Sequence, residues 1–166
     1  TQVLGKGLDL PKLSLLGVVL ADTGLSFPDF TAEEQTFQLL TQVIGRVSRG
    51  HLPGTVFLQT HNSQNPVLQA AIRKDYKSFY DHQLAERQQY LYPPFCYLLK
   101  LTCTRASAAS AQKTSAALAS QLQKQPHIQV IGPSPAFVEK TFGRFKWQLT
   151  IKATNRPALV KICQEL

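Results

Sequence analysis

The sequence predicts an α/β domain followed by a small α+β domain, and three observations support this. Residues 13–20 (LSLLGVVL) and 55–60 (TVFLQT) are apolar runs typical of strands, the first of a strand buried on both faces. A helical pattern lies between them, as in the strand–helix–strand unit of a doubly wound sheet. Beyond residue 91 the pattern changes to strand, helix, hairpin and helix, which is typical of an α+β sandwich lacking its last strand.

In the first half, the helix that follows residue 31 is expected to bury Phe37, Leu40 and Ile44 on one face. Gly45 weakens this helix near its end. Residues 65–90 are then polar and helical, with a turn at their start. Because two prolines in LYPPF exclude a helix after them, we place a domain boundary near residue 90, giving domains 1–90 and 91–166.

In the second half, alternation and turn signals predict the remaining elements. The turn is Phe142–Gly143, and the last helix tolerates Pro157 in its first turn. The expected strands are 96–105, 129–131, 137–141 and 144–153, and the expected helices are 106–124 and 155–166.

The net charge of +8 is unevenly distributed. Residues 1–90 carry 8 Lys+Arg and 8 Asp+Glu, whereas residues 91–166 carry 10 Lys+Arg and only Glu139 and Glu165. A charge confined to one domain predicts a surface for a polyanion, most often nucleic acid. A basic solvated face without a partner is the equally weighted alternative.

The sequence excludes several classes of protein. No apolar run approaches the roughly 18–20 residues that span a membrane, so no membrane association is expected. Cys96, Cys103 and Cys163 are isolated, which predicts neither a metal site nor a disulfide framework and fits a cytoplasmic protein. The opening residues read as the interior of a domain, and we expect the chain to be part of a longer protein.

The stretch QVIGRVSRG, residues 42–50, is the strongest candidate site. Arg46 and Arg49 share one face of a helix, and Gly45 and Ser48 keep the backbone beside them accessible. Two guanidinium groups placed in this way bind phosphate or stabilise charge in phosphoryl transfer. For an arbitrary helix, however, a solvated basic C-terminus favoured by the helix dipole would be the better interpretation.

A second glycine-containing stretch, GKGLDLP at residues 5–11, superficially suggests a phosphate loop. It lacks the spacing GxxxxGK[ST], which no other segment of the chain meets. Taken alone, it predicts a flexible turn rather than a ligand contact.

Several motifs together resemble a known family. TQVLGKGLDLP and LLTQVIGRVSRG are similar to motifs V and VI of superfamily 2 helicases. The intervening ADTGLSFPDF, with YPPF, IGPSPAFVEK and GRFKWQL farther on, resembles the PriA family of replication-restart helicases. The resemblance is collinear over essentially the whole chain.

The resemblance implies that residues 1–90 are the end of a second RecA-like lobe. ATP with Mg²⁺ would be the cofactor of the complete helicase, and the family's zinc-binding cysteines would lie outside this chain. Gln42, Arg46 and Arg49 would face the nucleotide, with Arg49 as the arginine finger. The positions that would couple nucleotide state to DNA are Thr1, Gln2, Gly5, Gly7 and Asp9.

For residues 91–166 the resemblance implies a domain similar to ribosomal protein S10, of ferredoxin-like type. It would contribute to binding forked or single-stranded DNA, the acidic tail of single-stranded DNA-binding protein, and other primosome proteins. Arg144 and Gln148 occupy the positions that match tail binding, with Lys146 between them. If residues 144–148 form a strand, these three side chains share one face, whereas Trp147 points to the other and is expected in the core.

Departures and alternatives remain. The family usually has Ala-Gly at Val47–Ser48 and arginine at Thr31 and Gln35. Because no phosphate loop is present, the chain alone is expected to lack ATPase activity. A non-catalytic basic module for nucleic acid is the second hypothesis, and an RNA- or ribosome-associated S10-like domain is the third.

Overall fold

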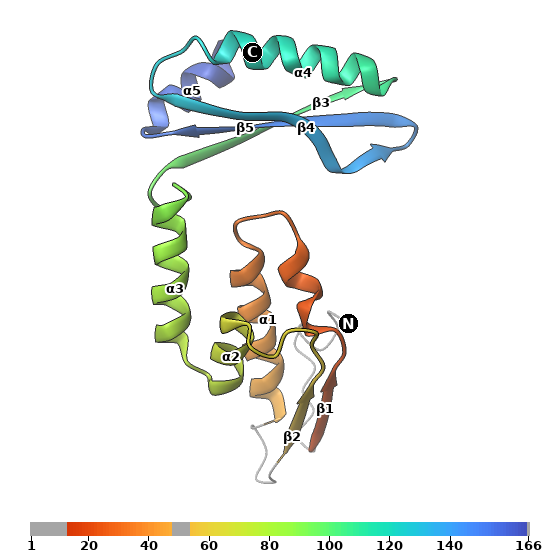
Figure 1. Ribbon diagram of the computed structural model, residues 1–166, viewed down its shortest axis with the longest axis vertical. Coiled ribbons are helices and arrows are strands. Elements are labelled where there is room, and N and C mark those ends of the chain that lie inside the picture. The colour runs from red at the N-terminus through yellow and green to blue at the C-terminus, as the bar shows by residue number, and fades with distance from the viewer. Residues whose placement is uncertain (1–12, 48–53, 166) are drawn as a thin grey trace. The chain divides into compact units, whose positions relative to one another are not determined.

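The computed structural model describes residues 13–47 and 54–165. The chain divides into two compact units, Thr1–Glu86 and Arg87–Leu166. Figure 1 labels the elements of both. None of the helices in the described ranges is both long and apolar enough to cross a membrane.

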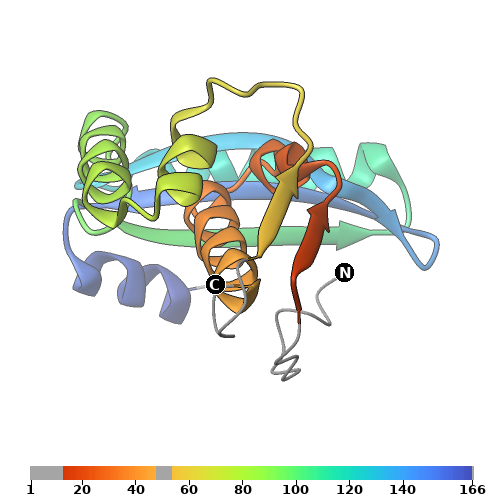
Figure 2. The same cartoon turned by 90° about the horizontal axis from the view of Figure 1, so that it is seen from below.

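The first unit has the predicted strand–helix–strand order. Strand β1 (Leu15–Val18) pairs in parallel with β2 (Thr55–Leu58), and Figure 2 shows them side by side. Between them lie a short 3-10 helix, η1 (Ala21–Ser26), and helix α1 (Ala32–Val47).

The prediction that β1 is buried on both faces is wrong for this chain. Leu16 is buried, but its neighbour Leu15 is 60% exposed, and Phe57 on β2 is 65% exposed. Successive side chains of a strand point to opposite faces, so the helices of this unit cover only one face of the sheet. In this apolar run, the side chains on one face of β1 are therefore covered and those on the other face are exposed.

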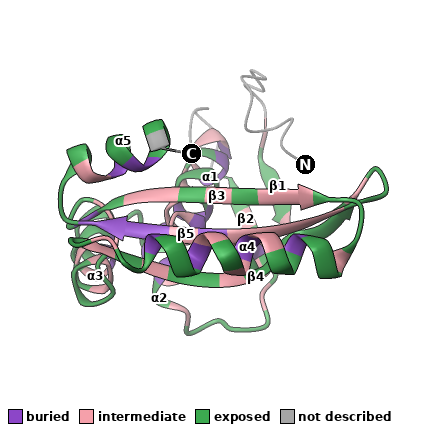
Figure 3. Cartoon of the chain, turned by 90° about the horizontal axis from the view of Figure 1, so that it is seen from above, coloured by how far each residue is buried: buried purple, intermediate pink, exposed green. Residues whose placement is uncertain are grey.

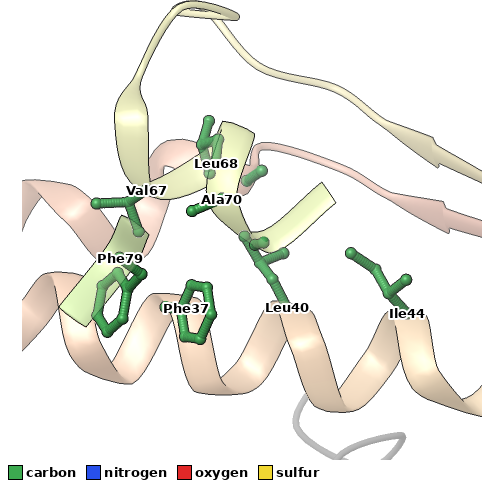
Figure 4. Packing of buried hydrophobic residues seen from close by; sticks show 9 residues of the cluster. Phe37, Leu40, Ile44, Val67, Leu68, Ala70 and Phe79 are labelled. Atoms are coloured by element: carbon green, nitrogen blue, oxygen red, sulfur yellow. The ribbon is translucent and has the colours of Figure 1, made fainter. Parts of the chain in front are cut away.

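The main core of the first unit lies along α1. Phe37, Leu40 and Ile44 are buried on one face, as the sequence predicts, and contact α2 (Pro66–Arg73) and α3 (Tyr76–Gln89). The rings of Phe37 and Phe79 stack with their centres 4.0 Å apart (Figure 4). Burial of each such side chain contributes about 1.5–3 kcal/mol.

The predicted single helix after residue 65 is two helices. Asn65 caps α2 by accepting from two backbone N–H groups, and Pro66 takes the first helical position. At the end of α2, Lys74 adopts the left-handed conformation with φ 56°. Asp75 then accepts from the backbone N–H and the hydroxyl of Ser78, which starts α3 and lowers the pKa of Asp75. The capping residue, which the pattern of polar residues did not reveal, divides the segment.

The second unit is a three-stranded antiparallel sheet with two helices. The strands are β3 (Tyr97–Arg105), β4 (Ile128–Thr141) and β5 (Arg144–Ala153), in the order β3-β5-β4. Helices α4 (Ala108–Leu122) and α5 (Arg156–Glu165) lie on the same side of this sheet (Figure 1). The mixed α+β character predicted for the second half is confirmed.

The core of this unit lies between the helices and β5. Leu149 and Ile151 are fully buried, and Ile151 forms one cluster with Ile162 of α5 and Leu122 of α4. Figure 3 shows that burial is concentrated at the C-terminal end of β5. The apolar residues that β5 contributes to this core, Ile151 and Ala153, lie on the same face of the strand.

The sequence predicts two separate strands at 129–131 and 137–141, but this is wrong, because both lie in the single strand β4. Its pairing with β5 shifts register between Ile131 and Ser134 and between Pro135 and Lys140. These irregularities accommodate the prolines, which cannot donate to the ladder, while pairing continues on both sides. The predicted hairpin turn is confirmed, with φ 49° at Phe142 and 76° at Gly143.

Candidate functional site

One face of the second unit's sheet carries no helix of that unit, and we call it the open face. Because Leu149, Ile151 and Ala153 point toward the helices, the alternate residues of β5 point the other way. Those residues are Arg144, Lys146, Gln148, Thr150 and Lys152. The three residues predicted for partner binding therefore share one face.

The neighbouring strands extend the open face with polar side chains. On β3, Thr102 lies opposite Gln148 and Thr104 lies opposite Lys146. On β4, Ser134 lies opposite Gln148 from the other side. None of the residues that pair with the open-face positions of β5 is acidic. The face thus combines cations with hydroxyl and amide groups, a composition suited to phosphate or carboxylate oxygens.

Exposure differs along this row of side chains. Arg144 is exposed, and Lys146 and Gln148 are half-buried. Alternate residues of a strand are spaced by about 6.6 Å, so the two charges can contact successive anionic groups of one extended ligand. The arrangement supports charge-assisted contacts rather than an enclosed pocket.

Trp147 lies on the opposite, helix-covered face. The register places it between Cys103 of β3 and Pro135 of β4, and it is half-buried. Its indole nitrogen is buried without a hydrogen-bond partner in the structure. Trp147 therefore lies on the predicted face, where it cannot stack on a ligand bound to the open face, but it is only half-buried and not a fully buried core residue.

Lys152 is a member of the open face that sequence reasoning missed. It is only 9% exposed, because its ammonium group donates to the carbonyl oxygen of Tyr90 and lies over the ring of Tyr92. No local sequence signal could have revealed this contact, since its two partners lie about sixty positions earlier in the chain. Lys152 holds the segment before β3 and is not available to a ligand.

In the first unit, Gln42 and Arg46 lie one turn apart on α1. Residues four apart share a helix face, as the predicted nucleotide contacts require. Gln42 is exposed and Arg46 is half-buried. Arg49, Thr1, Gln2, Gly5, Gly7 and Asp9 lie outside the described residues, so the predicted set is placed only in part.

Arg46 lies near the N-terminal ends of the two parallel strands. Its neighbour Val47 approaches Gly54, where an added Cβ would lie 2.1 Å from the Val47 side chain, and Gly54 precedes β2 directly. The backbone N–H of Thr55 bonds to the carbonyl of Ser14 at the same edge. This end of the sheet is therefore closely packed beside Arg46.

The opposite end of the strands is held by Asp22. Its carboxylate accepts from the hydroxyl of Thr60 at 2.6 Å and from the backbone N–H of His61 at 2.7 Å. These bonds lower the pKa of Asp22. Through these hydrogen bonds the carboxylate links the segment that follows β1 to the segment that follows β2, so its role is structural.

Thr31 and Gln35 are hydrogen-bonded to each other at the start of α1. The amide of Gln35 donates to the hydroxyl of Thr31 at 2.8 Å, and Thr31 donates to Asp29 at 2.6 Å. These two hydrogen bonds therefore stabilise the start of α1.

Comparison with known proteins covers both units. The family described as the primosomal protein N C-terminal domain matches residues 88–166. Replication restart protein PriA of Synechocystis sp. is 38% identical over 164 residues, which are 98% of this chain. The chain belongs to the PriA family.

Two further PriA proteins support this assignment. That of Bacillus subtilis is 39% identical over 166 residues, 97% of this chain, and that of Chlamydia trachomatis is 36% identical over 169 residues, 99% of this chain. The matches cover 19%, 21% and 22% of the three relatives, so the chain spans about a fifth of their length. The predicted PriA resemblance is confirmed over both units.

Proposed function

We propose that this chain acts as part of an ATP-dependent 3′→5′ DNA helicase that assembles the primosome and restarts stalled replication forks in the cytoplasm. The observation that supports this most strongly is the collinear match to replication restart proteins over 97–98% of the chain in the first two relatives. Within that helicase, residues 1–90 belong to the second RecA-like lobe, and residues 91–166 form the S10-like domain.

The proposed nucleotide contacts are Gln42, Arg46 and Arg49. Gln42 and Arg46, four positions apart, share a face of α1, and Arg49 follows Arg46 by three positions in the sequence. ATP with Mg²⁺ supplies the hydrolysis that drives movement, and this chain contributes cations to the phosphates. An arginine that reaches the γ-phosphate only when two lobes close couples hydrolysis to movement, with an effect of about 10³–10⁵ in rate.

Thr1, Gln2, Gly5, Gly7 and Asp9 would couple nucleotide state to the DNA strand. The chain has no GxxxxGK[ST] sequence, so we propose that these 166 residues do not hydrolyse ATP alone. The zinc-binding cysteines of the family are proposed to lie outside this chain.

The open face is the proposed surface for anionic partners. Arg144, Lys146 and Gln148 lie side by side on it, and the domain that carries them holds the whole net charge of +8. Phosphates of forked or single-stranded DNA and the carboxylates of the tail of single-stranded DNA-binding protein both fit such groups. An acidic tail peptide is expected to compete with DNA for this face.

Substitution of Arg49 in the complete helicase tests the proposal. Arg49→Ala is expected to lower DNA-stimulated ATPase activity at least 10³-fold while fork binding changes less than threefold. Arg73→Ala, which removes an exposed cation at the end of α2, is the matched control and is expected to keep normal turnover. Normal turnover in Arg49→Ala would contradict the assignment of the arginine finger.

A second candidate function is a basic nucleic-acid module without catalysis. The segregation of charge to residues 91–166 favours it for the isolated chain. Competition between fork DNA and structured RNA separates this reading from an RNA-associated role. Stronger binding of structured RNA would favour an S10-like RNA-binding domain over replication restart.

A further inference from the structure

Three side chains with metal-ligand chemistry meet between two helices of the first unit. Glu33 lies in the first turn of α1, and His82 and Glu86 lie one turn apart on α3. One potential ligand atom from each residue lies within 4.8 Å of the other two, and all three residues are half-buried. This cluster is separate from QVIGRVSRG and from the open face.

The packing of the two helices fixes this cluster. Phe37, one turn after Glu33, stacks on Phe79, which lies close to His82 along α3. Both rings belong to the main buried core. The backbone positions of the three candidate ligands are thus determined by packing that does not depend on any ion.

A buried amide holds the two carboxylates in place. Gln83 is only 7% exposed, and its Nε2 donates to Glu33 and also to Glu86, the second bond at 3.3 Å. Residues that bind metals typically have their ligand groups oriented by such outer hydrogen bonds. Gln83 therefore provides an orienting group of the kind that accompanies metal ligands.

Neither Glu33 nor Glu86 forms an ion pair with lysine or arginine among residues 13–47 and 54–165. Two carboxylates held together at a partly desolvated position repel each other, and a bound cation would offset that repulsion.

The donor set selects the class of cation. One imidazole with two carboxylates suits Zn²⁺ and related transition metals, whereas Mg²⁺ and Ca²⁺ prefer oxygen ligands alone. Donors around a tetrahedral zinc ion are about 3.4 Å apart, given bond lengths of about 2.0–2.2 Å. Small side-chain rotations would bring the three atoms from within 4.8 Å to that spacing.

We propose that Glu33, His82 and Glu86 bind one divalent transition-metal ion of the zinc class, which joins α3 to the start of α1. Three protein ligands leave a position for water. The site uses no cysteine, so it differs in chemistry from a thiolate zinc site. Its proposed role is to stabilise the packing of α1 and α3.

Titration of this chain with Co²⁺ as a spectroscopic probe, followed by Zn²⁺ competition, tests the proposal. We expect one equivalent of Co²⁺ to bind with visible d–d absorption, without the intense near-ultraviolet bands of thiolate ligation, and to be displaced by Zn²⁺. Glu33→Gln, His82→Ala and Glu86→Gln should each weaken binding at least tenfold. His61→Ala and Asp81→Asn, which alter exposed residues outside the cluster, should leave it unchanged.

Thermal unfolding shows whether the variants fold and whether the metal stabilises the packing. Saturating Zn²⁺ is expected to raise the melting temperature of the wild-type chain but not that of Glu33→Gln, whose metal-free melting curve remains cooperative. The proposal is overturned if Co²⁺ binds equally well to the three variants, if binding disappears only when the cysteines are replaced by serine, or if no equivalent binds at all. Mg²⁺ displacing Co²⁺ at equal concentration would also overturn it.

Discussion

The ammonium group of Lys152 donates to the backbone carbonyl of Tyr90 at 2.5 Å, across 62 positions of the chain. The same nitrogen lies 4.1 Å from the centre of the Tyr92 ring. Lys152 shares the open face with Arg144 and Lys146, but its ammonium group is already bound to Tyr90 and Tyr92 and is not available to a ligand. The ligand-binding capacity of β5 on this face therefore rests on Arg144, Lys146 and Gln148.

Substitution of Lys152 tests this division of roles. Lys152→Met should lower the free energy of unfolding by about 1.5–3 kcal/mol, because a hydrogen bond from a charged group and a cation–π contact are lost. Urea unfolding followed by circular dichroism measures this. Lys146→Met, at a half-buried position of the same face, should change stability by less than about 0.5 kcal/mol. The opposite ranking of the two variants would contradict the structural role of Lys152.

The stacked pair in the first core gives a second prediction. Phe37→Ala or Phe79→Ala should destabilise the first unit by about 3–5 kcal/mol, because each leaves a cavity in a packed core. Tyr80→Ala removes a ring that is 48% exposed, and should cost less than about 1 kcal/mol. Denaturant midpoints of the three variants provide the comparison, and similar midpoints would show that the stacked rings do not form the core.

The lowered pKa of Asp22 leads us to expect that the stability of the chain depends on pH. Its pKa is lowered in the folded chain by the bonds from Thr60 and His61, so the folded state binds fewer protons than the unfolded state around the ordinary aspartate value of 3.8. Its stabilising contribution is therefore present above that value and is lost as the pH falls through the lowered pKa.

Comparison of Asp22→Asn with the wild type isolates this contribution. Stability measured from about pH 6 down to about pH 2 should fall less steeply in Asp22→Asn. Thr60→Val removes the largest cause of the shift and should have an intermediate effect. Parallel pH profiles for the wild type and Asp22→Asn would show that the ionised Asp22 carboxylate does not stabilise the fold.

Substitution of Gly45 distinguishes an effect on helix stability from an effect on function in QVIGRVSRG. An added Cβ would meet no atom within 4 Å, so Gly45→Ala should stabilise α1 by about 0.5–1 kcal/mol. If nucleotide approaches the backbone beside Arg46, the same variant of the complete helicase should lose ATPase activity. Gly17→Ala, which also meets no atom within 4 Å, serves as the control with unchanged turnover. Full ATPase activity in Gly45→Ala would argue against close approach at this glycine.

Local periodicity predicted those features that depend on one element. It gave the buried face of α1 at Phe37, Leu40 and Ile44 and the turn at Phe142–Gly143. Alternation also separated Arg144 from Trp147 on β5, because two faces of a strand differ in burial wherever one packs on helices.

Features that depend on distant partners could not be predicted in this way. The burial of Lys152 requires the segment at Tyr90, and the meeting of Glu33 with His82 requires two helices to pack. The break before α3 depends on the hydrogen bonds that Asp75 accepts at the start of that helix. The exposure of one face of β1 depends on which elements cover the sheet. Each involves tertiary contacts or backbone conformations that composition and periodicity do not encode.

The salt dependence of fork-DNA binding by this chain tests the central claim, that the open face is the anion-binding surface. The informative variant is Arg144→Ala with Lys146→Ala. Its matched control, Lys113→Ala with Lys124→Ala, removes the same charge from exposed positions on α4 and just after it, away from the open face. If each open-face cation contacts one duplex phosphate, the slope of log K against log salt should become shallower by about 1.8 in the first variant and remain unchanged in the second. Equal changes in both variants would show that net charge, and not the open face, determines binding.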